Sequence, residues 1–369
     1  MKRLLATMLS VAMALSLVAC GGGQSNGSAS SKSDASTSGS SAPASSSAEK
    51  VDLGTELVLY STMTEGDLDA LITCFNEVYP DIEIEVVNGS AGELTARIQG
   101  EAAAPVGDLV WGGMGDSDGD KYADIFEKWI SVNDAQNMPG YTSRNGLYSM
   151  EHLSTVVFCV NEELEAQLGV EIKSYADLLN PALKGKIVLS DPNSSSAAWN
   201  NLCNIMSVFG NDSDAAWDYM EQLIPNLVIA SSSSACFKSV QQGEYVVGMT
   251  YEDGAVKLLK DGATNIRLQY PEEGTSATAF GSALIKGAPH KAAAQAMIDF
   301  LCSAEGQTAL AAYMEGTLRF TNAGYEVPEN AWLLPTSEIK WVDRDVDYLT
   351  ANKDSILAHW NDLFSKVQG

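Results

Sequence analysis

Small hydroxyl residues and glycines gather at four points where the sequence predicts that a helix begins. Glycine lets a ligand approach the backbone, a hydroxyl donates without bulk, and a helix N-terminus carries partial positive charge. Together these features favour binding of a small anion. The candidates are Ser61, Thr62, Ser90, Ala91, Asn193, Ser195, Ser196 and Ser234, with Gly112 and Gly113 after a predicted buried strand. The alternative is that these hydroxyls only cap helices.

Charged and aromatic side chains add a second kind of chemistry. Arg319 could hold a phosphate or phosphonate through two hydrogen bonds. Glu252 and Asp253, which follow Tyr251, could accept from sugar hydroxyls or pair with an ammonium group. Anion donors and carboxylates in one site suit a sugar phosphate or an aminophosphonate. The alternatives are a surface arginine, solvated acids and, for Trp111, a place in the core instead of stacking on a ligand.

Motifs for metals and catalysis are weak in this sequence. Residues 116–127 carry carboxylates at positions 1, 3, 5, 9 and 12 of a calcium-type loop, but the glycine stands at position 4 instead of 6. The three histidines are scattered, and the sequence holds no HExxH, GxSxG or Walker A motif. We expect no cofactor, no metal and no enzymatic activity. A secreted hydrolase that works through two carboxylates is the alternative from another class.

The charge balance limits the partners. The 369 residues include 22 Lys and Arg against 48 Asp and Glu, which gives a formal net charge of −26. Such an acidic surface repels phosphate backbones and anionic lipid headgroups, so we expect no nucleic-acid binding and no adhesion through a basic patch. The apolar content of 45% is that of an ordinary globular protein with a substantial core.

The N-terminal residues are typical of a lipoprotein signal peptide followed by a flexible tether. Lys2 and Arg3 precede an apolar run over residues 4–19 that is too short to span a membrane comfortably, and the run ends at Cys20 in the manner of a bacterial lipobox. We expect cleavage after residue 19 and lipidation of Cys20. Residues 20–50, rich in Ser and Gly, then predict a flexible tether. Five cysteines remain beyond it; they read mostly as small buried hydrophobes, and whether two of them pair stays open.

The rest of the chain alternates between strands and helices. Short apolar strands are predicted over residues 57–60, 82–87, 108–111 and 155–160, and helical periodicity over 64–79, 92–103, 197–209, 214–223 and 292–302. This alternation favours mainly parallel sheets covered by helices. Two such stretches in one chain suggest two α/β lobes.

An ordered series of segments resembles one family. The segments are LVLYS (57–61), FNEVYPDIEIEVV (75–87), DLVWGG (108–113), SYADLLNP (174–181), KGKI (184–187), GEYVVG (243–248), KGAPH (286–290) and FLCSAEGQ (300–307). Their order over residues 54–320 resembles the bacterial extracellular solute-binding proteins of ABC importers, in the group associated with ferric iron, thiamine, phosphonates and sugar phosphates.

The resemblance implies a fold and a domain plan. The expected fold is α/β, with two mixed-sheet lobes joined by crossing strands, as in periplasmic binding proteins. We expect residues 1–19 to be a signal peptide and 20–50 the lipidated tether. Lobe 1 is expected over 51–155 plus about 283–320, lobe 2 over 156–282, and a C-terminal helical segment over 321–369, packed on the lobes.

The resemblance also implies a function. We expect a monomeric lipoprotein, anchored to the membrane through Cys20 on its extracytoplasmic face, that captures a small solute between its lobes for an ABC permease and its ATPase. An arginine near the cleft is frequent in the region of Arg319 in this family. Ferric-iron members place two adjacent tyrosines where this chain has only Tyr251, which disfavours iron, although a ferric receptor remains an alternative.

Overall fold

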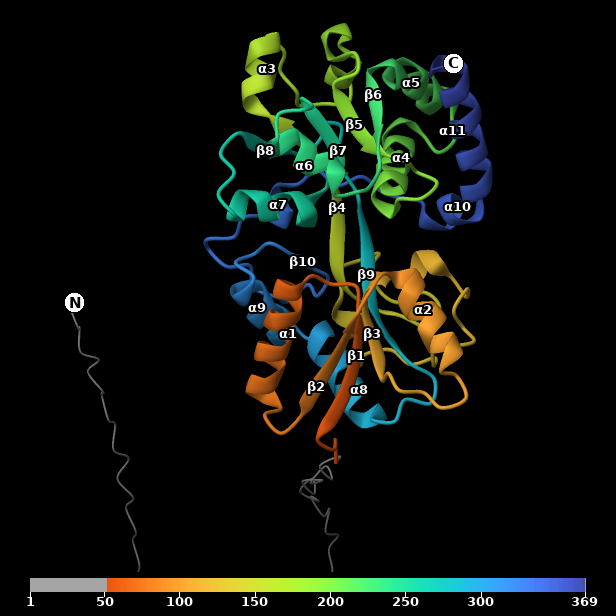
Figure 1. Ribbon diagram of the computed structural model, residues 1–369, viewed down its shortest axis with the longest axis vertical. Coiled ribbons are helices and arrows are strands. Elements are labelled where there is room, and N and C mark those ends of the chain that lie inside the picture. The colour runs from red at the N-terminus through yellow and green to blue at the C-terminus, as the bar shows by residue number, and fades with distance from the viewer. Residues whose placement is uncertain (1–51, 369) are drawn as a thin grey trace, which may run out of the picture. The chain divides into compact units, whose positions relative to one another are not determined.

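Two lobes stacked along the long axis share one ten-stranded mixed sheet in the computed structural model, which describes residues 52–368 (Figure 1). The main strand order is β2-β1-β3-β9-β4-β7-β5-β6, with β10 and β8 paired to β4. The predicted α/β fold with crossing strands is therefore confirmed. The predicted signal peptide, Cys20 and the tether lie outside the described residues. Within residues 52–368, no helix is both long and apolar enough to cross a membrane.

Lobe 1, the lower body in Figure 1, is built on the β2-β1-β3-β9 sheet and the first half of β4. Its strands are β1 (Glu56–Ser61), β2 (Glu83–Asn88), β3 (Leu109–Met114), β9 (Ala277–Leu284) and β10 (Arg319–Phe320). Its helices are α1 (Glu65–Val78), α2 (Ala91–Gly100), α8 (Lys291–Cys302) and α9 (Ala304–Tyr313). Strands β1, β2 and β3 run parallel, and β9 returns antiparallel.

Lobe 2, the upper body in Figure 1, is built on the second half of β4 with β7, β5 and β6. Its strands are β4 (Ser149–Asn161, shared with lobe 1), β5 (Ile187–Ser190), β6 (Leu227–Ala230), β7 (Val247–Tyr251) and β8 (Ile266–Gln269). Its helices are α3 (Glu162–Leu168), α4 (Ser196–Phe209), α5 (Asp214–Leu223), α6 (Ala235–Gln241) and α7 (Glu252–Lys260).

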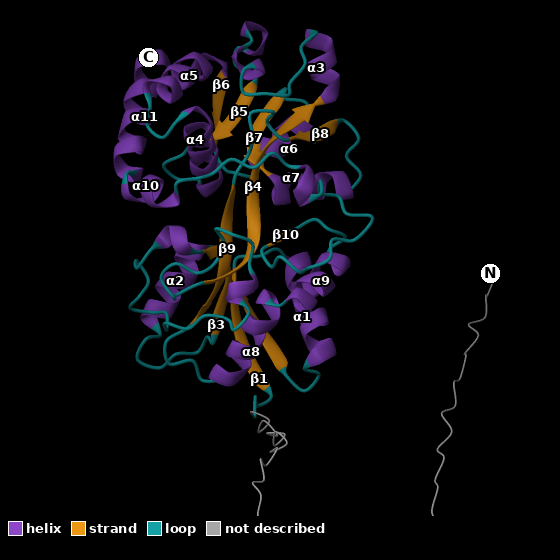
Figure 2. Cartoon of the chain, turned by 180° about the vertical axis from the view of Figure 1, so that it is seen from behind, coloured by secondary structure: helices purple, strands orange, loops and turns teal. Residues whose placement is uncertain are grey.

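Two C-terminal helices complete lobe 2. They are α10 (Val346–Ala351) and α11 (Lys353–Gln368), which lie beside α4 and α5 in both views of the chain (Figures 1 and 2). Ile356, Trp360 and Leu363 of α11 belong to the apolar core of this lobe. Burial of such large side chains stabilises the fold by roughly 1.5–3 kcal/mol each, so α11 is an integral layer of lobe 2.

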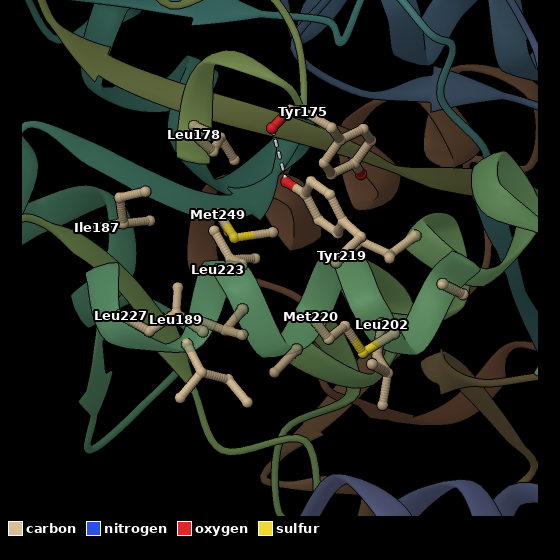
Figure 3. Close-up of a cluster of buried hydrophobic side chains, with 14 of the residues drawn as sticks. Tyr175, Leu178, Ile187, Leu189, Leu202, Tyr219, Met220, Leu223, Leu227 and Met249 are labelled. Carbon is tan, nitrogen blue, oxygen red and sulfur yellow. Dashed lines mark hydrogen bonds between the residues drawn. The ribbon is translucent and has the colours of Figure 1, made fainter. Parts of the chain in front are cut away.

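The core of lobe 2 contains a few polar groups that are satisfied internally. Figure 3 shows Tyr219 beside Tyr175 among Leu, Ile and Met side chains. The Tyr219 hydroxyl donates to the Tyr175 carbonyl oxygen at 2.8 Å, and the two rings meet edge to face. A buried hydroxyl without a partner would be costly, so this bond fixes the packing of α5 against the loop that holds Tyr175.

The lobes meet where β4 passes from one sheet half to the other. Residues up to Thr155 pair with β9, and residues from Val156 pair with β7. Beside this point the Val156 N–H donates to the Ser276 carbonyl oxygen at 3.1 Å, and the Thr275 hydroxyl donates to the Val156 carbonyl oxygen at 2.6 Å. The two connecting segments are thus tied to each other at the waist of the molecule.

Short helical turns, the calcium-like segment and the cysteines complete the description of the fold. Single 3-10 turns occupy Asp116–Asp118, Asp134–Gln136, Asp177–Leu179, Pro181–Leu183, Ile224–Asn226 and Thr336–Glu338. In the calcium-like segment, Asp116 and Asp118 accept from the backbone N–H groups of Arg144 and Gly115. Among the described residues, no cluster of His, Cys, Asp and Glu could hold a metal ion. The five body cysteines are buried free thiols.

Candidate functional site

A cleft of about 530 Å³ opens between the lobes, in front of the crossing strands. It is lined from lobe 1 by the loop after β1, from the waist by β4 and β9, and from lobe 2 by the starts of α4, α6 and α7. A volume of this size accommodates a small organic solute.

One wall, here called the lobe-2 wall, consists of Ser196, Ala197, Ser233, Ser234 and Lys238. Helix α4 begins at Ser196 and has no acidic residue in its first turn, so the positive end of its dipole faces the cleft without an acid of its own to neutralise it. Its first N–H groups have no intrahelical partner. Ser and Lys side chains add further donors, so this wall favours an anion.

A chain of hydroxyls fixes the lobe-2 wall. Ser195, the N-cap of α4, accepts from the Ala198 N–H at 3.1 Å. Its hydroxyl lies 2.8 Å from that of Ser190 at the end of β5 and 2.7 Å from that of Ser233 before α6. These contacts tie β5, α4 and the loop before α6 together, so the donors of the wall are held in place before a ligand arrives.

The opposite wall, here called the lobe-1 wall, consists of Thr62, Met63, Thr64, Asp67 and Gly113. Thr64 precedes α1 in a capping box in which its backbone N–H donates to Asp67 Oδ2 at 3.3 Å, and its hydroxyl donates to the same oxygen at 2.6 Å. Gly113 has φ +71°, and a Cβ there would come within 2.7 Å of Thr62 Oγ1. Position 113 therefore needs glycine. At the start of α1, the carboxylate of Asp67 neutralises the positive end of the helix dipole.

Lys257 of α7 reaches across the mouth of the cleft to the lobe-1 wall. Its ammonium group lies 2.7 Å from Asp67 Oδ2 and 3.2 Å from Thr64 Oγ1. The Asp67 side chain is buried, whereas that of Lys257 is 32% exposed. The pair joins the lobes at the edge of the cleft, where solvent screens it.

A buried histidine faces the cleft from the waist. The imidazole Nδ1 of His152 on β4 lies 2.7 Å from Glu151 Oε2, and both side chains are buried. Burial lowers the pKa of His152, but the Glu151 carboxylate, with help from Asp253 and Asp67, outweighs it, and the net pKa is raised above 6.5. The cleft therefore holds a histidine whose positively charged form is favoured by its carboxylate neighbours.

Asp253 stands beside this histidine at the start of α7. Ser154 of β4 donates to Asp253 Oδ1 at 2.9 Å. Burial raises the pKa of Asp253, and the positive charge of His152 opposes that rise. Asp253 thus adds a carboxyl group to the lining of the cleft, in addition to the donors of the lobe-2 wall.

Six of the residues predicted from the sequence line this cleft. They are Thr62, Gly113, Ser196, Ser234, Tyr251 and Asp253. They come from five separate segments of the chain, and the fold brings them together.

The structure places the other predicted residues elsewhere, in local structural roles. Ser61 donates to the Trp111 carbonyl oxygen in the core, and Gly112 lies within β3, next to Trp111, with φ +81°. Ser90 caps α2 through Glu93, ahead of Ala91. Asn193 bonds to Asp191 and Asn361 on the surface. Ser195 supports the lobe-2 wall from behind, and Trp111 is fully buried.

Arg319 and Glu252 pair with each other instead of facing the cleft. Arg319 Nη2 and Nε lie 2.6 and 3.1 Å from Glu252 Oε1 and Oε2, and both side chains are buried. Tyr270 also donates to Glu252, and Arg319 bonds to Thr336 and to the Leu334 carbonyl oxygen. With its donors used in this way, Arg319 joins β10 of lobe 1 to α7 of lobe 2.

Several cleft residues were missed at the sequence level, and three of them follow a simple rule. Asn200, Lys238 and Lys257 each lie four positions after a predicted residue, namely Ser196, Ser234 and Asp253. Residues four apart share one face of a helix, so extending each predicted helix start by one turn would have found them. His152 offers no such signal, because it lies within a long buried strand.

Comparison with known proteins places the chain in a family. Residues 70–333, more than half of the chain, match the family described as bacterial extracellular solute-binding protein. The chain belongs to this family. One relative of this chain is a probable ABC-transporter periplasmic-binding protein of Sinorhizobium fredii. It is 25% identical over 70% of this chain and 74% of its own length. An uncharacterised protein of Haemophilus influenzae is 26% identical over 68% of this chain and 74% of its own length.

Solved structures of periplasmic binding proteins share the fold of this solute-binding protein. AfuA of Actinobacillus pleuropneumoniae, with fructose 6-phosphate bound, superposes with a TM-score of 0.70 at 26% identity and covers 84% of this chain and 99% of AfuA. Iron-bound HitA of Pseudomonas aeruginosa gives a TM-score of 0.68 at 20% identity over 84% and 99% of the two chains. The second likeness shows the fold alone.

Proposed function

We propose that this solute-binding protein captures a small phosphate- or phosphonate-bearing solute in the cleft and delivers it to an ABC permease driven by its ATPase. We further propose that the protein is a monomer, that lipidated Cys20 anchors it on the extracytoplasmic face, and that it performs no catalysis. The cleft residues that we assign to binding are Thr62, Gly113, His152, Ser196, Ser233, Ser234, Lys238, Tyr251 and Asp253.

The lobe-2 wall is the observation that carries this proposal. An acid-free helix start, three serines and a lysine face one cavity, which is the donor set that a phosphate group needs. His152 lines the same cleft, and its raised pKa favours the positively charged form. The fructose 6-phosphate bound by AfuA, 26% identical to this chain, supports the same ligand class.

Binding is proposed to close the lobes around the ligand. The phosphate would take donors from the lobe-2 wall, while Asp253 and the lobe-1 wall would accept from hydroxyl or ammonium groups on the remainder of the solute. Contacts to both walls make the closed state more favourable when ligand is present, and the strands at the waist serve as the hinge.

A ferric-iron receptor is the second candidate within the family. Phenolates are good ligands for ferric iron, but burial raises the pKa of Tyr251 and so disfavours its phenolate. The acids Asp67 and Asp253 could assist a metal, but each is already bonded, to Lys257 and Ser154 respectively. The phosphorylated solute is therefore the better supported ligand.

Calorimetric titration with a panel of solutes tests the proposal. We expect fructose 6-phosphate, inorganic phosphate or 2-aminoethylphosphonate to bind, and ferric citrate not to bind. A Lys238→Gln variant should lose about tenfold in affinity, since a charge-assisted hydrogen bond contributes about 1.5–3 kcal/mol. Lys366→Gln is the matched control, because Lys366 pairs with Glu221 on the surface of α11.

The outcomes separate the candidates. Binding of ferric citrate alone, with visible phenolate absorption, would replace the proposal with the iron receptor. Release of inorganic phosphate or of sugar during the titration would instead favour the carboxylate hydrolase. Equal affinity in the Lys238 and Lys366 variants would show that the lobe-2 wall does not hold the phosphate.

A further inference from the structure

Asn200 of α4 lies between the cleft and a second, smaller cavity of about 70 Å³ behind the crossing strands. Its side chain is 7% exposed, yet it borders both spaces. The small cavity is also bordered by Arg344, from the segment that returns to lobe 2 after β10, and by Thr278 of β9.

Two donors hold the amide of Asn200 from behind. Thr278 Oγ1 donates to Asn200 Oδ1 at 2.7 Å, and Arg344 Nη1 lies 3.2 Å from the same oxygen. Arg344 Nη2 donates to the backbone carbonyl oxygen of Asn200 at 2.9 Å. Because a guanidinium has donors and no acceptor, the amide atom that faces Arg344 must be the oxygen and not the nitrogen.

This arrangement decides what Asn200 offers to a ligand. With Oδ1 turned to Arg344, the Nδ2 group stands on the other side of the amide, and the neighbouring turn of the same helix face carries Ser196 of the lobe-2 wall. We infer that Asn200 is a further ligand-binding residue that can only donate into the cleft, and that Arg344 is the positioning residue that fixes it in this state. The inference rests on the proposed function.

The consequence is a link between the C-terminal segment and ligand affinity. Arg344 does not border the cleft, yet it orders a donor there, while Trp341 of the same segment pairs with Thr275 at the waist. A donor that is already oriented binds more tightly than one that must be ordered on binding. Loss of the guanidinium should therefore weaken binding without removing any group from the cleft.

Four variants of the whole described chain test the inference with fructose 6-phosphate as the probe. We expect Arg344→Gln to weaken binding about fivefold and Arg344→Lys, which keeps one charged donor, to restore part of the loss. Asn200→Asp should abolish measurable binding, because it replaces the donor with a carboxylate, while its melting temperature stays equal or rises through the new ion pair with Arg344. Arg144→Gln is the control, since Arg144 borders the same small cavity but pairs with Asp347.

A second readout needs no ligand. The order parameter of the Asn200 side-chain NH₂, measured by ¹⁵N relaxation, should be high in the wild type, low in Arg344→Gln and unchanged in Arg144→Gln. Equal rigidity in all three proteins, or unchanged affinity of Arg344→Gln for a probe that the wild type binds, would overturn the inference. If the wild type binds no phosphorylated probe, the proposed function fails, and the order parameters alone decide the role of Arg344.

Discussion

The two walls of the cleft use the same local chemistry and carry opposite charge. Both contain the start of a fourteen-residue helix that follows a hydroxyl N-cap, Thr64 before α1 and Ser195 before α4, although of the two caps only Thr64 borders the cavity. In the first turn α1 has Glu65 and Asp67, whereas α4 has no acid. The partial positive charge of a helix start is therefore available to a ligand only on the lobe-2 wall.

The difference gives the cleft a direction. Under the proposed function, an anionic group would bind against lobe 2, where Lys238 and the start of α4 lie, and neutral or cationic parts of the solute would face Asp67 across the cleft. Lys257 shows the same preference of a cation for the lobe-1 wall, because its side chain extends from α7 of lobe 2 and pairs with Asp67. A hydroxyl-rich helix start is therefore not enough to predict an anion site. The first turn must also be free of acidic residues, which would neutralise the positive end of the helix.

The largest expected effect concerns a pair that belongs to neither wall. Arg319→Met leaves Glu252 buried without its charge partner, which costs about 3–5 kcal/mol of the free energy of unfolding. Urea denaturation should show this loss, and Arg319→Met combined with Glu252→Gln should recover much of it. Affinity for fructose 6-phosphate, measured where the variant is folded, should change less than twofold. A large loss of affinity would return Arg319 to the binding site.

A smaller effect is expected at the waist, where the pKa of the buried His152 is raised. His152→Gln should lose about tenfold in affinity at pH 6, because a charge-assisted contact is replaced by a neutral one. Since the pKa of His152 is raised in the folded protein, its charge is held below pH 6.5 and is lost as the pH rises through the folded value. The affinity difference between wild type and variant should shrink accordingly towards pH 9.

The control for this pH dependence is His359→Gln, because His359 stacks on Trp217 in lobe 2. Glu151, Asp253 and Asp67 are the charged groups that act on His152, so the same titration with Asp253→Asn should move its midpoint to lower pH. An affinity difference that stays constant from pH 6 to pH 9 would mean that His152 does not contact the ligand as a cation.

The smallest effect tests the lobe-1 wall itself. Asp67→Asn removes an acid from the cleft and releases Lys257, so affinity for a phosphorylated solute should rise about threefold, a change of under 1 kcal/mol. The cap of α1 loses part of its strength, and stability should fall by about 0.5–1 kcal/mol. Asp69→Asn, on the exposed side of α1 beside Tyr313, makes the same change in net charge as a control. A fall in affinity would contradict the claim that the acid of the lobe-1 wall disfavours an anionic ligand.

The sequence carried much of the fold because its signals are local. The Thr64 cap, the apolar spacing that follows and the strand alternation predicted α1, β2 and β3 directly. The binding site was harder to predict, because it depends on which helix starts face the cleft in the folded chain. Ala91 and Ser196 are the first residues of α2 and α4, and each follows a serine N-cap, but only Ser196 lines the cleft. Tertiary packing decides which helix start faces the cleft.

Arg319 shows a second limit of sequence reasoning. Its partner Glu252 is 67 residues away, and nothing local distinguishes an arginine that binds phosphate from one that closes a buried ion pair. His152 was missed for a similar reason, since the raised pKa depends on Asp253 and Asp67 from other elements as well as on adjacent Glu151. Electrostatic roles of this kind follow only from the assembled structure.

One substitution tests the central claim, that the start of α4 holds the anionic group of the ligand. Asp at the first helical position interacts favourably with the helix dipole, so Ser196→Asp should keep or raise the melting temperature while it repels an anion. Titration with fructose 6-phosphate should show at least about a thirtyfold loss of affinity, equivalent to about 2 kcal/mol. Ala91→Asp, at the same position of α2 outside the cleft, should bind like the wild type. Unchanged affinity in Ser196→Asp, or an equal loss in Ala91→Asp, would contradict the account.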